Sequence, residues 1–235
     1  MLNSWPYFDK EQIEAAMQVL QSGKVNYWQG NQTKLFEEEF ARWCGTKYAI
    51  AVSNGSSALS LAYSAIGLSE GDEFITTART FIATTLCGIE LGAKPIFADV
   101  DINSGAITSD TIEPLISKKT KCIAVVHLGG WPADMIAIKK LAKKYNLFLI
   151  EDCSQAHGAQ IINKGKKSSV GSFGDIATWS FCQDKIISTG GEGGMITTSN
   201  KELMNTIWSL KDHGKTLDAL KKSSPGNSYK WLHEE

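Results

Sequence analysis

The sequence of 235 residues lacks any marked excess of charge. Lysine and arginine together total 24 and aspartate and glutamate total 25, which leaves a formal net charge of −1. No basic stretch is interleaved with aromatic residues, so we expect no nucleic-acid partner. The most basic run, residues 164–167, predicts a solvated hairpin tip.

The sequence also lacks a long apolar run. No stretch of about 18 apolar residues occurs, which is close to the length that a membrane helix needs. The N-terminus has no basic region followed by an apolar core, as an export signal would have. We therefore expect no membrane partner, no export and a cytoplasmic location.

Cysteine and histidine are scarce and scattered. The four histidines show no zinc spacing, no cluster with cysteine and no Ser/His/Asp order, so we expect no metal site. We interpret His157 as a structural residue. The five cysteines are an odd number and stand mostly inside apolar segments, which predicts reduced core thiols rather than a disulfide framework. They are Cys44, Cys87, Cys122, Cys153 and Cys182.

The glycine patterns that bind nucleotides are absent as well. No G-x-G-x-x-G follows the first expected strand, and no G-x-x-x-x-G-K-S/T occurs, which excludes a P-loop. The glycines of residues 190–194 follow an apolar strand and a lysine loop and open no dinucleotide turn. These absences argue against the alternative of a Rossmann-type oxidoreductase.

What the sequence does contain is an alternation of short apolar runs and helical patterns. Hydrophobic residues make up 43% of the chain, enough for a sizeable core in one or two domains. The alternation is typical of βαβ units, so we predict a three-layer α/β/α fold with a mostly parallel central sheet. The expected helices cover residues 9–21, 32–43, 54–66, 82–91 and 135–145, and the expected strands cover residues 48–52, 73–77, 95–100, 122–127, 147–150, 176–181 and 195–198.

One lysine stands out because of its neighbours. Residues 179–185 read as an apolar strand that ends at Ser180, then a short loop and Lys185, and the glycine-rich residues 189–194 follow. A lysine amine beside a loop that lets backbone approach closely could hold a carbonyl cofactor. The alternative, for a lone lysine near glycines, is a solvated loop position.

An aspartate follows a second buried strand. The apolar residues 147–150 predict a parallel strand whose carboxyl end carries Asp152, and ligands of open α/β sheets bind outside those ends. A carboxylate in a dry site must find a cation, a donor or water. A protonated ring nitrogen would serve, and pyridoxal phosphate needs both such an acid and a lysine.

A third segment offers a phosphate site. Ser56 and Ser57 follow the strand at residues 48–52 and open an apolar-periodic helix, so hydroxyl and free N–H groups gather at a helix N-terminus. The alternative for a serine pair in this position is an ordinary helix cap.

The three segments, in this order, resemble the fold-type I pyridoxal phosphate enzymes. The similarity narrows to the DegT/StrS-like sugar aminotransferases and runs from about residue 28 to the end of the chain. Five ordered blocks carry it: residues 51–59, 80–84, 95–101, 151–159 and 180–185.

The resemblance implies a role for each matching residue. Lys185 would be the catalytic residue, which binds the aldehyde of pyridoxal 5'-phosphate and shuttles a proton, while Asp152 would pair with the pyridine nitrogen. Gln155 would lie near the phenolic oxygen of the ring. Phe81 would stack on one ring face, with core packing as its alternative, and Ser154 would lie under the other face. The phosphate ligands would be Ser56, Ser57 and Ser180.

The resemblance also implies how the chain is organised. Residues 1–30 would form an N-terminal arm and helix, and residues 31–235 would form the cofactor-binding large domain, with the C-terminal small domain absent. In the family, a segment like residues 229–234 leads into a motif with an asparagine and an arginine. Asn227 is not the asparagine of that motif, because it precedes this segment rather than following it. We therefore expect a fragment, a truncated gene product or one piece of a split reading frame that transfers amino groups poorly by itself.

The implied function is transfer of an amino group to a keto sugar carried on a nucleotide. Glutamate is the expected amino donor, the pathway is surface polysaccharide or amino-sugar biosynthesis, and the expected assembly is a homodimer. The alternative, from a class other than enzymes, is a truncated, catalytically silent protein that binds the cofactor or has a regulatory role. Turnover with glutamate and a keto-sugar nucleotide would separate the two.

Overall fold

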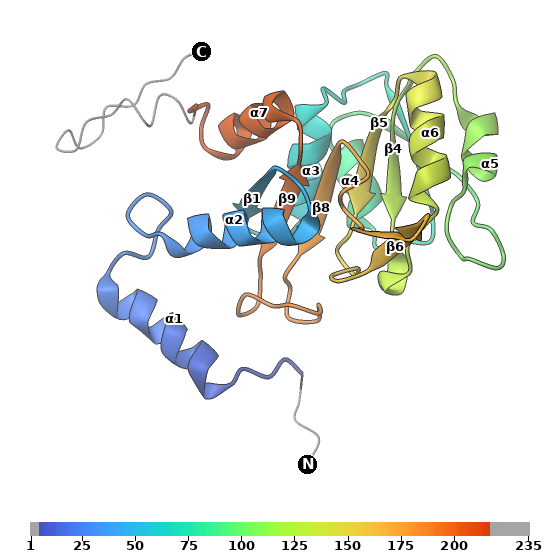
Figure 1. The fold of residues 1–235 in the computed structure, drawn as a ribbon. Helices are drawn as coiled ribbons and strands as arrows, with labels where there is room; N and C mark the ends of the chain where they lie inside the picture. The colour runs from blue at the N-terminus through green and yellow to red at the C-terminus, as the bar shows by residue number, and fades with distance from the viewer. Residues whose placement is uncertain (1–4, 217–235) are drawn as a thin grey trace.

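The computed structural model describes residues 5–216, in which a seven-stranded sheet lies between two layers of helices (Figure 1). The expected segment at residues 229–234 and Asn227 lie outside the described residues. The order of the strands in space is β1-β9-β8-β5-β4-β2-β3. Their bounds are β1 Tyr48–Val52, β2 Glu73–Thr76, β3 Lys94–Phe97, β4 Thr120–Val126, β5 Phe148–Asp152, β8 Ile176–Ser180 and β9 Gly194–Thr198.

The sheet is mostly parallel, as the sequence predicts. The pairs β2–β3, β2–β4, β4–β5 and β5–β8 are parallel, whereas β9 is antiparallel to both of its neighbours, β8 and β1. Strands β4, β5 and β8 therefore end at the same edge, and the segments that follow them meet there.

Two helical layers cover the sheet. Helices α3, α4 and α7 pack on one face around a core that includes Tyr63 and Trp208, while α5 and α6 cover β2, β4 and β5 on the other face. Helix α2 joins that second face and packs on Trp179 and Phe181. The helix bounds are α1 Lys10–Ser22, α2 Gln32–Cys44, α3 Gly55–Ala65, α4 Ala83–Ile89, α5 Ser109–Ile112, α6 Met135–Tyr145 and α7 Lys201–Lys211.

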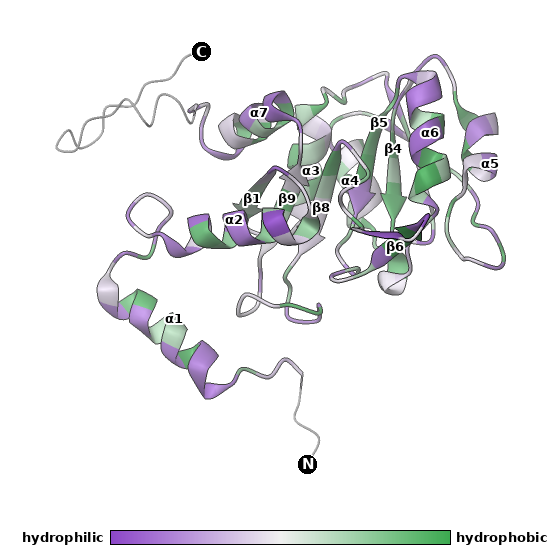
Figure 2. Cartoon of the chain, viewed as in Figure 1, coloured by the Kyte–Doolittle hydropathy of each residue, from purple (hydrophilic) through white to green (hydrophobic). Residues whose placement is uncertain are grey.

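Strand β5 divides its side chains between the two layers. Leu149 belongs to the core on the α6 side and Ile150 to the core on the α3 side. Because side chains alternate along a strand, Glu151 faces the α6 side and Asp152 faces the α3 and α4 side. Figure 2 shows that hydrophobic residues line the central strands β4 and β5, so both carboxylates stand at the end of an apolar strand.

Local capping explains the helix bounds that the sequence predicts. Helix α1 begins with a capping box, in which Asp9 and Gln12 exchange hydrogen bonds of 2.8 and 2.9 Å. Helix α6 has the predicted bounds, because Asp134 accepts from Ala137 at its start and Asn146 takes a left-handed conformation at its end.

The structure differs from the sequence prediction at several element ends. Strand β3 ends at Phe97 rather than at residue 100, and α4 spans Ala83–Ile89 rather than residues 82–91. Helix α5 was not predicted. The hairpin at residues 164–167 is confirmed, since β6 Gln160–Asn163 pairs with β7 Lys166–Ser169.

Helix α1 buries none of its residues and stands apart from the sheet (Figure 1). Its exposed apolar side chains include Ile13, Met17 and Leu20. The division into an arm of residues 1–30 and a domain of residues 31–235 stays a prediction. Among the described residues, no helix is both long enough and apolar enough to cross a membrane.

Candidate active site

Several of the predicted site residues meet at the carboxyl edge of the sheet. Asp152 is the last residue of β5, is 5% exposed and lies opposite Thr178 of β8. Ser180 ends β8 two residues later and is also buried. The start of α3 reaches the same edge, because β1 brings it there.

The N-terminus of α3 can approach Ser180 because residue 55 is a glycine. A Cβ atom at Gly55 would lie 2.8 Å from the Ser180 Cβ and 3.5 Å from the Ser154 Oγ. Asn54 caps the helix by accepting from the Ser57 N–H at 2.8 Å. The N–H groups of Gly55 and Ser56, the first two residues of the helix, have no acceptor inside the helix and are suited to bind an anion.

Asp152 holds two hydrogen bonds within its buried setting. Its Oδ2 accepts from the Thr84 hydroxyl at 2.7 Å, and its Oδ1 accepts from the Ser154 N–H at 3.1 Å. None of the ion pairs within residues 5–216 includes Asp152. The charge of this carboxylate is therefore solvated by hydrogen bonds, and each oxygen keeps one lone-pair direction for a further partner.

Two neighbouring cavities border these residues. A groove of about 1150 Å³ is lined by Ser56, Ser57 and Phe81 among others, and a pocket of about 20 Å³ is lined by Asp152, Gln155 and again Phe81. The small pocket has room for about one water. Room for a ring beside Asp152 therefore depends on where the Phe81 side chain stands.

Phe81 does not pack in the core, so the alternative that the sequence allows for it is wrong. Its side chain is 68% exposed, next to the exposed Ile82, Leu86 and Ile89. An exposed phenyl group can change its rotamer at little cost, because few neighbours hold it.

In the region that the structure describes, the Lys185 side chain has no hydrogen bond or ion pair to another predicted site residue. Lys185 follows Ser180 on a loop that is held by bonds from the Gln183 N–H to the Gly191 carbonyl and from its own N–H to the Cys182 carbonyl. Its Nζ donates to Asp184 Oδ2 at 2.7 Å, and it is not among the residues that line either cavity. This hydrogen bond lowers the pKa of Asp184.

His157 is buried between Trp179 and Phe181, with ring centroids 5.4 and 5.6 Å away. Neither of its ring nitrogens has a hydrogen-bond partner in the described part of the chain. Burial, helped by the nearby charge of Lys185, lowers the pKa of His157 to about 4. The imidazole is therefore neutral near pH 7, which agrees with its interpretation as a structural residue.

Gln155 connects two loops at the sheet edge. Its Oε1 accepts from the Gly129 N–H at 2.8 Å, which ties the loop after β5 to the 3₁₀ turn Leu128–Gly130 after β4. Gly129 and Gly130 both have positive φ, a conformation that glycine adopts without steric cost. The side-chain NH₂ group of Gln155 remains as a donor.

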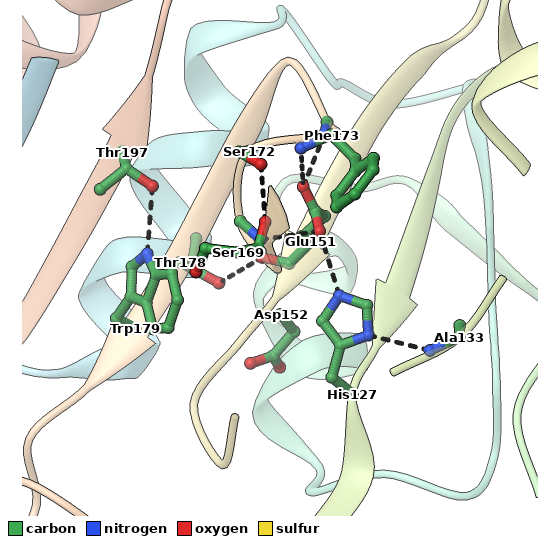
Figure 3. Close-up of polar contacts among 12 residues, drawn as sticks. His127, Ala133, Glu151, Asp152, Ser169, Ser172, Phe173, Thr178, Trp179 and Thr197 are labelled. Carbon is green, nitrogen blue, oxygen red and sulfur yellow. Dashed lines mark hydrogen bonds and ion pairs between the residues drawn. The ribbon is translucent and has the colours of Figure 1, made fainter. Parts of the chain in front are cut away.

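Glu151, beside Asp152 in sequence, forms a buried clamp on the opposite face (Figure 3). His127 Nδ1 accepts from the Ala133 N–H at 3.2 Å, so Nε2 carries the proton and donates to Glu151 at 3.1 Å. Burial alone would raise the pKa of Glu151, but hydrogen bonds from His127 and from backbone N–H groups lower it. Those backbone donors are Gly171, Phe173 and Gly174, at 2.6 to 2.8 Å.

The clamp accounts for the cluster of His127, Glu151 and Cys153, whose ligand atoms lie within 4.8 Å of one another. Both imidazole nitrogens and both carboxylate oxygens already take part in hydrogen bonds. We therefore interpret the cluster as structural rather than as a metal site.

Sequence reasoning assigned no role to Thr84 or to the clamp residues Glu151 and His127. Thr84 lies within the block of residues 80–84 that carries part of the family resemblance, but its partner is 68 residues away. The available signal was a pair of threonines, Thr84 and Thr85, at the start of an otherwise apolar helix.

The fold is that of the pyridoxal phosphate-dependent aminotransferases. More narrowly, the DegT/DnrJ/EryC1/StrS aminotransferase family matches residues 6–232, and the chain belongs to that family. Aminotransferases of this family use pyridoxal phosphate, and one solved neighbour, NtdA from Bacillus subtilis, is described with bound cofactor PMP.

The similar proteins are longer than this chain. The aminotransferase from Psychrobacter cryohalolentis has a TM-score of 0.93 at 48% identity, over 99% of this chain and 58% of its own. The spore coat polysaccharide biosynthesis protein SpsC of Bacillus subtilis is 38% identical over 98% of this chain and 57% of its own. GDP-perosamine synthase of Escherichia coli is 46% identical over 79% of this chain and 50% of its own. The chain thus spans about half the length of the curated relatives it matches.

Proposed function

We propose that the protein is a pyridoxal phosphate-dependent aminotransferase that acts on a keto sugar carried on a nucleotide. The observation that carries this proposal is the buried Asp152 carboxylate, which accepts from the Ser154 N–H, while the Ser154 side chain lies close to Gly55 at the start of α3. One end of this arrangement suits a protonated ring nitrogen and the other suits a phosphate. The relative that is named as a GDP-perosamine synthase supports the substrate class.

Each predicted residue has a proposed task. Bound pyridoxal phosphate supplies a ring that withdraws electrons from the substrate carbon. Asp152 holds the proton on the ring nitrogen, Gln155 donates its NH₂ group to the phenolic oxygen, and Phe81 covers one ring face. The proposed phosphate ligands are Ser56, Ser57 and Ser180, together with the first N–H groups of α3.

Lys185 is the proposed covalent anchor of the cofactor and the group that moves the proton. For this task its amine must leave Asp184. The Asp184 side chain is 65% exposed, and an exposed ion pair contributes only about 0–1 kcal/mol to stability. Breaking the Lys185–Asp184 pair therefore costs little free energy. The glycines at residues 190 and 191, both with positive φ, let the neighbouring loop adjust.

The remaining parts of the proposal concern the wider context. Glutamate is the proposed amino donor, surface polysaccharide or amino-sugar synthesis the proposed pathway, and the cytoplasm the proposed location. The exposed apolar side chains of Phe81, Ile82, Leu86 and Ile89 support a homodimer, because a patch of this kind beside a site suits a covering subunit. The proposed domain that holds the site comprises residues 31–235.

A catalytically silent protein that binds the cofactor is the second candidate. An absorbance spectrum of the purified protein with pyridoxal phosphate, followed by a turnover assay with glutamate and keto-sugar nucleotides, separates the cases. A visible band with amino transfer supports the enzyme. A visible band without transfer supports the silent protein only when a version extended to the length of a close relative also fails to transfer. If no band forms at saturating cofactor, both are wrong.

A further inference from the structure

Thr84 lies at the start of α4 and contacts Asp152 directly. Its side chain is fully buried, and its Oγ1 stands 2.7 Å from Asp152 Oδ2. A threonine in a helix commonly donates to the carbonyl of the preceding turn. Here the hydroxyl instead reaches a residue 68 positions away, across the gap between α4 and the end of β5.

The directions of the hydrogen bonds follow from the chemistry of the groups. An ionised carboxylate can only accept, so Thr84 donates its single hydroxyl proton to Asp152. Thr80 Oγ1 lies 2.9 Å from Thr84 Oγ1, and Thr80 must then be the donor of that bond. The two threonines form a chain that ends on Asp152, in which each donor is polarised by the next.

The backbone of Thr84 is held at both of its polar groups. The hydroxyl of Tyr63, a fully buried residue of α3, donates to the Thr84 carbonyl at 2.7 Å. The Thr84 N–H donates to the Phe81 carbonyl at 3.2 Å. The same turn therefore carries Phe81 on its exposed side and Thr84 on its buried side.

Asp152 is consequently held at both of its oxygens, by the Ser154 N–H at Oδ1 and by Thr84 at Oδ2. We propose that Thr84 is a positioning residue, which fixes the plane of the Asp152 carboxylate so that a remaining lone pair faces the ring nitrogen of the cofactor. The part of this inference that concerns the cofactor rests on the proposed function. The part that concerns the hydrogen bond from Thr84 to Asp152 rests on the geometry alone.

The test compares Thr84→Val, which keeps the branched shape without the hydroxyl, with Thr84→Ser, which keeps the hydroxyl. Thr85→Val is the matched control, since Thr85 is a buried threonine of the same turn and has no hydrogen bond to Asp152. The first measurement is the ¹³C resonance of the Asp152 carboxyl carbon in cofactor-free protein at pH 7, assigned with Asp152→Asn. The second is the absorbance maximum and dissociation constant of added pyridoxal phosphate.

We expect Thr84→Val to shift the resonance and the absorbance maximum, to weaken cofactor binding about tenfold and to lower kcat by roughly tenfold to a hundredfold, as the loss of one bond to a charged group implies. Thr84→Ser and Thr85→Val should behave like the unmodified protein. If Thr84→Val lowers the melting temperature, Thr84→Ala, which demands no branched fit, is measured in the same way.

A Thr84→Val resonance and spectrum identical to those of the unmodified protein would overturn the inference. So would equal effects of Thr84→Val and Thr85→Val. The resonance could shift as expected while neither the unmodified protein nor any variant binds pyridoxal phosphate. In that case the proposed function is wrong, but the positioning of Asp152 by Thr84 is supported.

Discussion

At the scale of single residues, the two groups on which the proposed chemistry depends differ in how firmly they are held. Asp152 is buried and takes hydrogen bonds from Thr84 and Ser154. Lys185 is half-buried on a loop and bonds an exposed neighbour, Asp184. A fixed carboxylate and a movable amine suit a site in which one group holds charge and the other transfers a proton.

The assignment of Lys185 can be tested by chemical trapping. Borohydride should reduce the bond between protein and pyridoxal phosphate, and peptide mapping should then find the pyridoxyl group on Lys185, because this lysine alone follows the buried strand end at Ser180. Lys185→Arg keeps the charge and should abolish the adduct. An adduct on Lys211, which lines the large groove, would contradict the assignment.

Replacement of Asp152 by asparagine tests its pairing with the ring nitrogen. The change keeps the size of the side chain but removes the charge, so turnover, measured in a version extended to the length of the relatives, should fall by two or more orders of magnitude while the cofactor still binds. Each factor of ten corresponds to about 1.36 kcal/mol of transition-state stabilisation. Steady-state kinetics with absorbance titration measure both effects, and near-normal amino transfer by Asp152→Asn would exclude this role.

At the scale of elements, the site depends on how closely α3 approaches the end of β8. The first helical turn can bring its N–H groups to Ser180 because no Cβ stands at Gly55. Strand β9 also requires a glycine where it contacts the start of α3, since a Cβ at Gly194 would lie 2.4 Å from the Asn54 carbonyl oxygen. Two glycines from distant parts of the chain therefore let one helix start lie against two strands.

Gly55→Ala tests this close approach. Alanine favours a helix by up to about 1 kcal/mol over glycine, but overpacking against the Ser180 Cβ costs about 1–3 kcal/mol. We expect a net loss in the free energy of unfolding and a cofactor dissociation constant raised at least tenfold, measured by denaturant titration and absorbance. Ser64→Ala, later in α3, is the control for helix propensity.

A double variant separates steric clash from other causes. Gly55→Ala combined with Ser180→Gly removes the opposing Cβ, so part of the lost stability should return. If Gly55→Ala binds the cofactor and unfolds like the unmodified protein, the approach of α3 to β8 is not tight.

At the scale of the whole molecule, the sequence predicted the layers and the edge where the site residues gather. Periodicity sufficed for α1 and α6, and the structure shows caps at Asp9, Asp134 and Asn146 close to the predicted helix ends. The antiparallel direction of β9 and the partners of Thr84 and Glu151 could not be predicted. These depend on pairings between residues 14 or more positions apart, which no local spacing records.

The position of Phe81 also could not be predicted from the sequence. An aromatic residue beside a helix is most often in the core, and the sequence alone favoured that interpretation. The structure exposes it instead, because α4 turns its apolar residues at positions 83 and 87 toward the sheet and leaves Phe81 before the first turn.

The stability of the whole molecule should depend on pH through His157. Its pKa is lowered to about 4 in the folded protein from an ordinary value of 6.5. Between these values the unfolded chain binds a proton that the folded protein does not, so the free energy of unfolding rises with pH across this window. The full change is about 3 kcal/mol, since each pH unit contributes about 1.36 kcal/mol.

His157→Phe should remove this dependence, because phenylalanine can stack on Trp179 and Phe181 and cannot titrate. Urea unfolding at pH 7, 6, 5 and 4.5 measures it. Below about pH 4.5 both proteins should lose further stability, because Glu151 then binds a proton in the unfolded chain that it does not bind in the folded protein, where its pKa is lowered. An unmodified protein equally stable at pH 7 and pH 4.5, or a His157→Phe variant with the same slope, would show that the imidazole is not buried in its neutral form.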